Sequence, residues 1–321
     1  MMNILVLTNK GDITSDFIVQ NLSELGVPFY RLNTDEIGNT IRLSLDVINN
    51  EYLIYDYARD IIIDLLQIKS VYFRRPEIFV HAGAVTIGEK NFVKSELSFT
   101  LEAVYRILDN AFWVNTVDAI RAAENKLYQL MLANEIGFII PNTILSNQPS
   151  SAMSFFSENN CSCIIKPIKS GLVSGGTEEG VIFTSKVHLD DDNIDRILSC
   201  PVYLQNHIPK NADLRVTLIG NKLFCAMIHS QEEEDSIVDW RKARHPLRHS
   251  VHELPKEITV KCFQLAKKLN LNFAAIDFIL DQKNNYIFLE INPNGQWAWI
   301  ERQLNFKISD EITKLLIKNA A

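Results

Sequence analysis

The first 33 residues read as a strand, a helix and a second strand, and this order limits the possible folds strongly. Residues 3–9 (NILVLTN) form an apolar run, residues 14–26 (TSDFIVQNLSELG) have the spacing of an amphipathic helix that ends at a glycine, and residues 27–33 (VPFYRLN) form a second apolar run. A strand, a crossover helix and a strand are typical of a parallel sheet, so we predict an α/β fold. The turn TNKGDITS lacks G-x-G-x-x-G and does not indicate a dinucleotide site.

The remaining sequence predicts further lobes of mixed α and β structure. With 321 residues, 47% of them hydrophobic, the chain can bury more than one small core. We expect a hairpin over residues 41–56 and long helices over 89–108 and 118–137, and then strands alternating with one helix over 256–270. The predicted domains are an N-terminal α/β domain (1–117), a central lobe with a glycine-rich loop (118–201) and a C-terminal lobe (202–321).

Charge and cysteine content exclude several classes of protein. The formal net charge is -7 and there is no long basic run, so we do not expect a nucleic-acid partner. The five cysteines form no C-x-x-C pair and follow no secretory leader, which favours a reduced cytoplasm. No apolar stretch approaches the roughly 20 residues that cross a bilayer, so a soluble protein is expected. The partner is then a small molecule, a peptide or another protein.

A lysine and a glycine-rich loop suggest a phosphate site in the central lobe. Lys166 ends the apolar run CIIKP, and the loop SGLVSGGTEEG follows it with Gly175 and Gly176 at its centre. Glycines let backbone N–H groups approach an anion closely, and lysine supplies a compact positive charge. The alternative is a flexible turn. The loop lacks G-x-x-x-x-G-K-[ST], which excludes a P-loop.

Three oxygen-bearing side chains at strand ends predict a magnesium site. Glu290 and Asn292 lie two residues apart in FLEINPNG and therefore share one face of a strand. Asp277 lies in the apolar run AAIDFIL, and a hairpin would bring it beside them. Hard oxygen ligands suit Mg²⁺, here two ions that bridge phosphates. The alternative is a charged strand end that turns into a loop. Trp297 and Trp299 alternate like strand residues, and we expect them to anchor the turn that follows Asn292.

Two cations are ambiguous by themselves. Arg215 lies among apolar residues in LRVTLIG, where an unpaired guanidinium would be costly, so it needs either a protein carboxylate or a bound phosphate. Lys126 lies on a predicted helix, where a lysine usually faces solvent.

The order of these pieces, from Asn125 to Glu301, resembles the ATP-grasp superfamily of carboxylate ligases. The resemblance implies an ATP-grasp fold with ATP between two lobes. It assigns Lys126 and Lys166 to the phosphates, and Arg215 to the γ-phosphate or the acyl group. It further implies an adenine site at Gln205, Asn206, His207 and Ile208, a ribose or substrate site at Lys210 and Asp213, and Mg²⁺ ligands at Asp277, Glu290 and Asn292.

A narrower resemblance covers nearly the whole chain. The stretches VYFRRPE, PKNADLRVTLIGNKLF, DWRKA and EINPNGQWAWIE are similar to the ATP-grasp peptide maturases of the microviridin and graspetide type. This implies a Rossmann-like pre-ATP-grasp domain, a homodimer, and a precursor peptide whose leader binds away from the active site. The implied reaction phosphorylates Asp or Glu side chains of that peptide. Thr, Ser or Lys side chains then displace phosphate and close ω-ester or ω-amide rings.

The implied mechanism must overcome the repulsion between a substrate carboxylate and the triphosphate of ATP. A carboxylate that attacks ATP meets repulsion, so Lys126, Lys166, Mg²⁺ and Arg215 must neutralise the triphosphate. Closure of residues 170–180 would protect an acyl phosphate from water. Arg241 in DWRKA is a candidate for steering the substrate carboxylate, and a surface arginine is the alternative. Two other functions stay open: a different ATP-grasp enzyme, such as a glutamate ligase or a small-molecule peptide synthetase, and a non-catalytic ATP-binding regulatory module.

Overall fold

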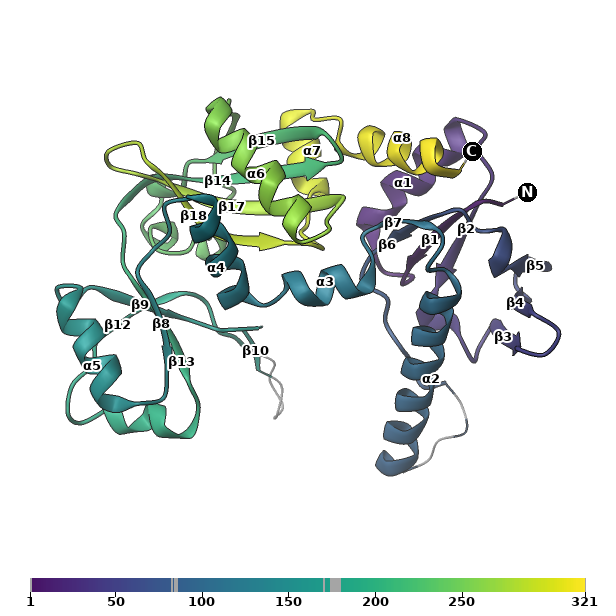
Figure 1. Cartoon of the computed structure of the whole chain (residues 1–321), viewed down its shortest axis with the longest axis horizontal. Coiled ribbons are helices and arrows are strands. Elements are labelled where there is room, and N and C mark those ends of the chain that lie inside the picture. Colours follow the sequence, from purple (N-terminus) through teal and green to yellow (C-terminus); the bar gives the residue numbers. More distant parts are fainter. Residues whose placement is uncertain (1, 82, 84–85, 170, 174–179, 321) are drawn as a thin grey trace. The chain divides into compact units, whose positions relative to one another are not determined.

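The computed structural model of the chain describes residues 2–81, 83, 86–169, 171–173 and 180–320 (Figure 1). The chain forms two compact units. The first unit contains Met1–Ile120, Leu271–Phe273 and Asn294–Ala321, and the second contains Arg121–Asn270 and Ala274–Pro293. The three-domain division at residues 117 and 201 stays a prediction.

The first unit is built on a parallel sheet, as the opening strand, helix and strand predict. Its order is β2-β1-β6-β7, and every neighbouring pair is parallel. Helix α8 packs against β6, β7 and helix α1. The elements are β1 (Ile4–Thr8), α1 (Ile13–Glu24), β2 (Phe29–Asn33), β6 (Ser70–Phe73), β7 (Phe112–Val114), α7 (Ala298–Leu304) and α8 (Ile308–Ala320).

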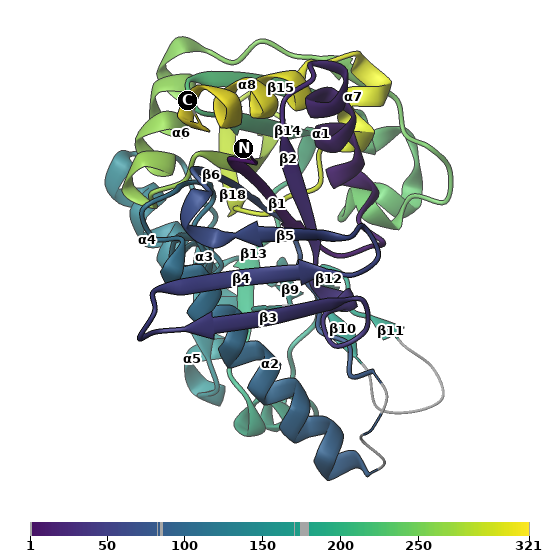
Figure 2. The same cartoon turned by 90° about the vertical axis from the view of Figure 1, so that its right-hand side faces the viewer.

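A small antiparallel sheet and a long helix complete the first unit. Strands β3 (Ile41–Asp46), β4 (Glu51–Asp56) and β5 (Ile61–Asp64) lie side by side in Figure 2. The predicted hairpin is therefore present, with β5 as an additional strand. Helix α2 (Ile87–Ile107) begins with a capping box between Thr86 and Glu89.

The second unit contains two larger sheets, in which the pairs β12–β9, β9–β13, β13–β8, β16–β15, β15–β14 and β17–β18 are antiparallel. The order of the first is β12-β9-β13-β8, and the order of the second is β16-β15-β14-β17-β18. Helix α4 packs against β18 and α6. Strand bounds are β8 (Thr143–Ser146), β9 (Cys163–Lys166), β12 (Ser185–Val187), β13 (Val202–Asn206), β14 (Lys210–Ile219), β15 (Lys222–Ile228), β16 (His249–Val251), β17 (Phe273–Asp281) and β18 (Tyr286–Asn292). Helix bounds are α5 (Pro149–Glu158) and α6 (Lys256–Lys268).

Short 3₁₀ helices connect several of these elements. They are η1 (Thr34–Glu36), η2 (Leu65–Gln67), η3 (Ile194–Ser199), η4 (Ser230–Glu232), η5 (Glu234–Ser236) and η6 (Trp240–Lys242).

The predicted single helix over residues 118–137 is wrong. The chain forms α3 (Val117–Ala123) and α4 (Lys126–Ile136), because the side chain of Asn125 accepts a hydrogen bond from the backbone N–H of Tyr128 and caps a new helix. Helix α4 ends at Gly137, as predicted, with a left-handed φ of 88°. The break makes Lys126 the first residue of α4.

The prediction of a single helix after residue 202 is also wrong, since α7 and α8 follow α6.

Trp297 and Trp299 lie at the start of α7 and not in a strand. The Trp297 side chain is fully buried, donates a hydrogen bond to the hydroxyl of Tyr72 and packs edge-on against Phe17. Its burial anchors the chain just after β18, as the sequence suggested for the tryptophans.

Among the described residues, no helix has the length and apolar character that a membrane span requires.

One buried amide ties α4 to the strand that carries Glu290 and Asn292. Gln129 donates hydrogen bonds from Nε2 to the carbonyl oxygens of Ala123 and Ile291 and accepts one from the N–H of Ile291 at 3.0 Å. Ile291 lies between the two polar residues, so Gln129 fixes the backbone that aims them.

We expect Gln129→Leu to destabilise the second unit by about 1–3 kcal/mol, because the main-chain groups of Ile291 would be buried without partners. Urea unfolding measures the change. The matched control is Gln20→Leu, since the Gln20 amide donates a hydrogen bond to Glu24 at an exposed position. Equal midpoint shifts in both variants would contradict the role of Gln129.

Candidate active site

The three predicted metal ligands lie together at one end of the β17–β18 pair. Asp277 and Glu290 are cross-strand partners, and Asn292 lies two residues beyond Glu290. The Asn292 amide donates from Nδ2 to Asp277 Oδ2 and Glu290 Oε1, both at 3.2 Å. A half-turn of this amide would present Oδ1, the atom that a hard cation requires. The alternative of a strand end that merely turns into a loop does not explain this convergence.

The two carboxyl groups differ in pKa. Burial raises the pKa of Asp277 to about 7; the charge of Arg215 opposes this effect, and the smaller effect of the Glu290 charge adds to it. Burial also acts to raise the pKa of Glu290, but Lys126, Lys166 and the Asn292 hydrogen bond outweigh it and hold that pKa at about 2. At neutral pH the negative charge is therefore concentrated on Glu290, and a bound divalent cation would favour ionisation of both groups.

Arg215 projects from β14, the neighbour of β17 in the sheet. Its Nε lies 2.9 Å from Asp277 Oδ1, and only 9% of the residue is exposed. Its Nη1 is buried and has no hydrogen-bond partner among the described residues. The sequence left open whether Arg215 meets a carboxylate or a phosphate. The structure supplies the carboxylate and leaves Nη1 available for a bound anion.

Two lysines add positive charge to the same site. Lys126 donates from Nζ to the carbonyl of Pro167 at 3.0 Å and lies 3.4 Å from Glu290 Oε2, with its side chain 20% exposed. It therefore does not sit on a solvated helix face. Lys166 lies at the end of β9 with Nζ 5.5 Å from the centre of the Tyr203 ring. The pKa of Lys166 is lowered to about 8, chiefly by burial; Glu290 opposes this effect, and the charges of Lys126 and Arg241 add to it.

The loop after Lys166 begins and ends with a short strand pair. Strand β10 (Leu172–Val173) pairs with β11 (Gly180–Val181). A Cβ on Gly171 would lie 2.1 Å from the carbonyl oxygen of Ile182, so only glycine fits at the base of this hairpin. Gly175 and Gly176, the centre of the predicted phosphate cradle, lie outside the described residues, as does much of the predicted lid over 170–180.

Arg241 is held by Asp239, a residue that the sequence reasoning missed. The Arg241 guanidinium donates from Nε to Asp239 Oδ1 at 2.8 Å and from Nη2 to Oδ2 at 2.7 Å. Asp239 is only 5% exposed and also accepts a hydrogen bond from the N–H of Thr184, just beyond β11. The charge of Arg241 lowers the pKa of Asp277 and Glu290, so the guanidinium acts electrostatically on the carboxylate pair. The acidic residue directly before Trp240 and Arg241 was the available signal.

The candidate adenine residues lie at and after the end of β13. The Gln205 side chain is buried and donates to Thr143 Oγ1 at 2.9 Å and to the Tyr203 hydroxyl, so it is engaged within its own sheet. The N–H groups of Asn206 and His207 donate to the carbonyls of Asn142 and Ser162. Ile208 directly follows His207 in the chain. An adenine role for Gln205, Asn206, His207 and Ile208 stays a prediction.

Lys210 and Asp213 form a buried ion pair with each other. Lys210 Nζ donates to the two Asp213 oxygens at 2.8 and 2.6 Å and to the carbonyl of Val238 at 3.3 Å. Burial raises the pKa of Asp213, and Lys210 partly offsets this effect. Because each charge neutralises the other, a contact with ribose or substrate stays a prediction for both.

The residues present fit a magnesium nucleotide. Lys126, Lys166 and Arg215 exceed the charge of the two carboxylates, and the buried Arg215 Nη1 lacks a partner within the described chain. The described residues contain no group of three His, Cys, Asp or Glu side chains that could hold a metal. Two carboxylates and one amide instead suit an ion that takes its remaining ligands from phosphates and water.

Comparison with known proteins agrees with this geometry. Residues 123–316 match the RimK-like ATP-grasp domain, and residues 3–121 match the MvdD pre-ATP grasp domain. A probable alpha-L-glutamate ligase from Vibrio vulnificus (strain YJ016) is 25% identical over 235 residues, which is 71% of this chain and 75% of the relative. A second relative with the same description, from Haemophilus influenzae, is 22% identical over 213 residues, which cover 65% of this chain and 68% of its own.

Two solved structures are similar over essentially the whole chain. The macrocyclase MdnC from Microcystis aeruginosa MRC, bound with precursor peptide MdnA, has a TM-score of 0.88 and 27% identity and covers 99% of this chain and 100% of its own. A Chryseobacterium gregarium RiPP-associated ATP-grasp ligase, in complex with ADP and a leader and core peptide, has a TM-score of 0.90 and 26% identity, with 100% and 98% covered. The resemblance read from the sequence is confirmed. The chain belongs to the RimK-like ATP-grasp family of ligases, and an MvdD pre-ATP-grasp domain precedes its ATP-grasp domain.

Proposed function

We propose that this ligase activates Asp or Glu side chains of a ribosomally made precursor peptide as acyl phosphates and forms ADP. Thr, Ser or Lys side chains of the same peptide then close ω-ester or ω-amide rings. The observation that carries the choice of a peptide substrate is the similarity to MdnC and the Chryseobacterium ligase over 99% and 100% of the chain, N-terminal domain included. Both of those ligases are described with bound peptides.

The oxygen-bearing and the cationic residues of the site have different proposed roles. ATP supplies the phosphoryl group and Mg²⁺ supplies positive charge on its oxygens. Asp277, Glu290 and Asn292 would hold Mg²⁺, which we propose binds as two ions. Lys126, Lys166 and Arg215 Nη1 would bind phosphate oxygens and reduce the repulsion that a substrate carboxylate meets. Residues 170–180 would exclude water from the acyl phosphate.

Arg241 is proposed to steer the substrate carboxylate. Its Nε and Nη2 are engaged by Asp239, which leaves Nη1 for a substrate, and the side chain is 53% exposed. Asp239 would then act as a positioning residue that sets the direction of Arg241. An arginine held on one edge by a carboxylate loses little conformational freedom when it binds a second one.

The remaining proposals concern partners and location. We propose a homodimer in the cytoplasm that binds neither nucleic acid nor membranes. The net charge of -7 and the absence of any disulfide among the described cysteines support this setting.

A glutamate ligase is the second candidate, because curated relatives of that description align with about 70% of the chain. It would be favoured if free glutamate, without any peptide, stimulated ADP release. A purely regulatory ATP-binding module has less need of three converging metal ligands and of Arg215.

The first experiment incubates the purified protein with Mg-ATP and the precursor peptide encoded beside its gene. We expect the peptide to lose one water mass per ring with one ADP formed for each, and mild base to open esters but not amides. Intact mass and nucleotide analysis follow both products. Glu290→Ala should abolish both. An unchanged peptide, or undiminished ATP turnover in Glu290→Ala, would contradict the assignment.

The pKa of Lys166 predicts a pH dependence of nucleotide binding. The charged lysine binds phosphate and its pKa without ligand is about 8, so affinity for Mg-ADP should fall as pH rises through 8, by up to about tenfold per pH unit. Calorimetric titration from pH 6.5 to 9.5 measures this. Lys166→Met should bind weakly and show no further loss of affinity above pH 8, where Asp277 is largely ionised, whereas Lys222→Met, at an exposed position, should keep the wild-type profile. A wild-type affinity that stays constant up to pH 9.5 would contradict the assignment of Lys166.

A double-mutant cycle tests Arg241 and Asp239 together. We expect Arg241→Ala to lower kcat/KM for ring closure by about 100-fold and Asp239→Asn by about tenfold, with little change in Mg-ADP affinity. If Asp239 acts through Arg241, the double variant should be no worse than Arg241→Ala. Normal ring closure in Arg241→Ala would refute its role, and additive losses would show that Asp239 acts independently.

A further inference from the structure

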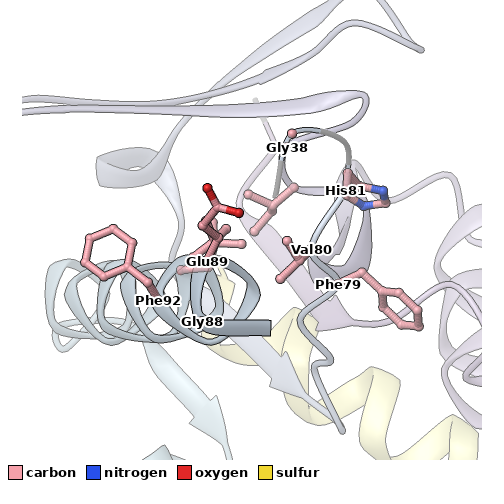
Figure 3. A pocket seen from close by; sticks show the side chains of 11 residues that line it. Gly38, Phe79, Val80, His81, Gly88, Glu89 and Phe92 are labelled. Carbon is pink, nitrogen blue, oxygen red and sulfur yellow. The ribbon is translucent and has the colours of Figure 1, made fainter. Parts of the chain in front are cut away.

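A cavity of about 610 Å³ lies beside the start of α2 in the first unit (Figure 3). Its lining is mainly apolar. Its ionisable side chains are bonded within the unit, Glu89 to the N–H and hydroxyl of Thr86 and His81 to the carbonyl of Asp35. The lining therefore identifies no ligand, and the more informative charges lie in the second unit.

The Lys210–Asp213 pair at the start of β14 is directed into the protein. The two side chains are only 7% and 8% exposed, and Lys210 Nζ donates to both oxygens of Asp213. Burial raises the pKa of Asp213, and Lys210 and a hydrogen bond from the Ser230 hydroxyl oppose this effect. A ribose hydroxyl would have to displace one of these buried, charge-assisted bonds, so the pair is poorly placed to bind nucleotide.

Residues 229–248, which we call the 229–248 loop, connect β15 to β16 and contain η4, η5 and η6. Connections longer than about 12–15 residues are usually functional. The loop is closed at its base, where the N–H of His229 donates to the carbonyl of Arg248 at 3.0 Å. Inside it, the buried Ser236 hydroxyl donates to the carbonyl of Ser230 at 2.6 Å. The loop is therefore a compact structure that can hold a side chain in one direction.

The tip of this loop, residues 238–242, carries Arg241. Three hydrogen bonds join the tip to neighbouring elements: from Lys210 Nζ to the carbonyl of Val238 at 3.3 Å, from the N–H of Thr184 to Asp239 Oδ2 at 3.2 Å, and from Lys242 Nζ to Ser185 Oγ at 3.2 Å. Two of these bonds involve the segment that leads into β12, and the bond of Lys210 comes from β14. Because Val238 directly precedes Asp239, this bond fixes the backbone from which Asp239 and Arg241 project.

We propose that the Lys210–Asp213 pair positions Arg241 for the substrate carboxylate by fixing the tip of the 229–248 loop. Lys210 supplies the bond to Val238, and Asp213 neutralises the ammonium group and holds it in place. This role differs from the contact with ribose or substrate that the family resemblance implies. The inference rests on the proposed function, in which Arg241 steers a carboxylate of the peptide. A guiding group must be held to within about 0.5 Å, so loss of one anchor should impair the reaction more than nucleotide binding.

A double variant removes the pair without leaving one charge buried alone. In Lys210→Met/Asp213→Asn, we expect kcat/KM for ring closure of the precursor peptide encoded beside the gene to fall about tenfold, with Mg-ADP affinity within about twofold of wild type. In an Arg241→Ala background the same change should cost less than about twofold, because the pair acts through Arg241. If the double variant fails to fold, Asp213→Asn alone should show the same pattern with a loss of about threefold.

Hydrogen exchange measures the position of the tip without any peptide. Backbone amides of residues 238–242 should exchange about tenfold faster in the double variant, whereas those of α6 should keep their wild-type rates. The matched control is Lys314→Met/Glu311→Gln, which removes an ion pair of 2.7 Å in α8 of the first unit. It should leave kcat/KM and the exchange of residues 238–242 within about twofold of wild type.

The outcomes separate this inference from the proposed function. Wild-type kcat/KM in the double variant, or losses that add to those of Arg241→Ala, would overturn the positioning role. A loss of Mg-ADP affinity of about tenfold or more would assign the pair to the nucleotide and overturn it as well. If the wild-type protein closes no rings, the proposed function fails, while faster exchange of residues 238–242 would still show that the pair fixes the tip, and unchanged exchange would refute this too.

Discussion

The close approach of Asp277 and Glu290 is the constraint on which the rest of the site depends. Two partly buried carboxylates on adjacent strands repel each other, and burial penalises the charge of both. The fold compensates with Lys126 and Arg215, each within ion-pair distance of one carboxylate. It does not compensate fully, since the pKa of Asp277 remains at about 7. An uncharged ligand would leave this imbalance in place, whereas a magnesium nucleotide would supply both the cation and the anion that the groups lack.

Local backbone features aim these groups. The interruption between α3 and α4 places Lys126 at a helix start, where its side chain reaches both Pro167 and Glu290. One turn further, Gln129 holds the backbone of Ile291 between Glu290 and Asn292. Helix α4 therefore contributes a cation and also positions two of the proposed metal ligands. A continuous helix over 118–137 would have changed the direction of the Lys126 side chain. The break between α3 and α4 is therefore needed to place Lys126 in the site.

The sequence predicted those parts of the fold and site that depend on short patterns. A two-residue alternation is enough to put Glu290 and Asn292 on one face, and an apolar strand, helix and strand are enough to predict the parallel sheet. The pattern over 118–137 failed because the apolar spacing continues through Asn125, whose side-chain cap competes with the helix hydrogen bonds. Gln129 was missed because its partner Ile291 is distant in sequence, whereas Asp239 lies only two residues before Arg241 and could have been found from that spacing. The adenine role of residues 205–208 was predicted only from the family resemblance. Nothing in the sequence indicated that the Gln205 side chain bonds to Thr143 and Tyr203.

Asp239 links the base of the glycine-rich hairpin to Arg241, the residue proposed to steer the substrate carboxylate. Its carboxylate accepts one hydrogen bond from Thr184, three residues past β11, and two from the guanidinium of Arg241. Burial acts to raise the pKa of Asp239, but the hydrogen bonds and charge of Arg241 outweigh it, so the group stays ionised at neutral pH. A fixed buried anion shared by both elements resists independent movement of either one. If the hairpin closes over an activated carboxylate, Asp239 has already oriented Arg241 when closure occurs. The same movement would then exclude water and position the carboxylate.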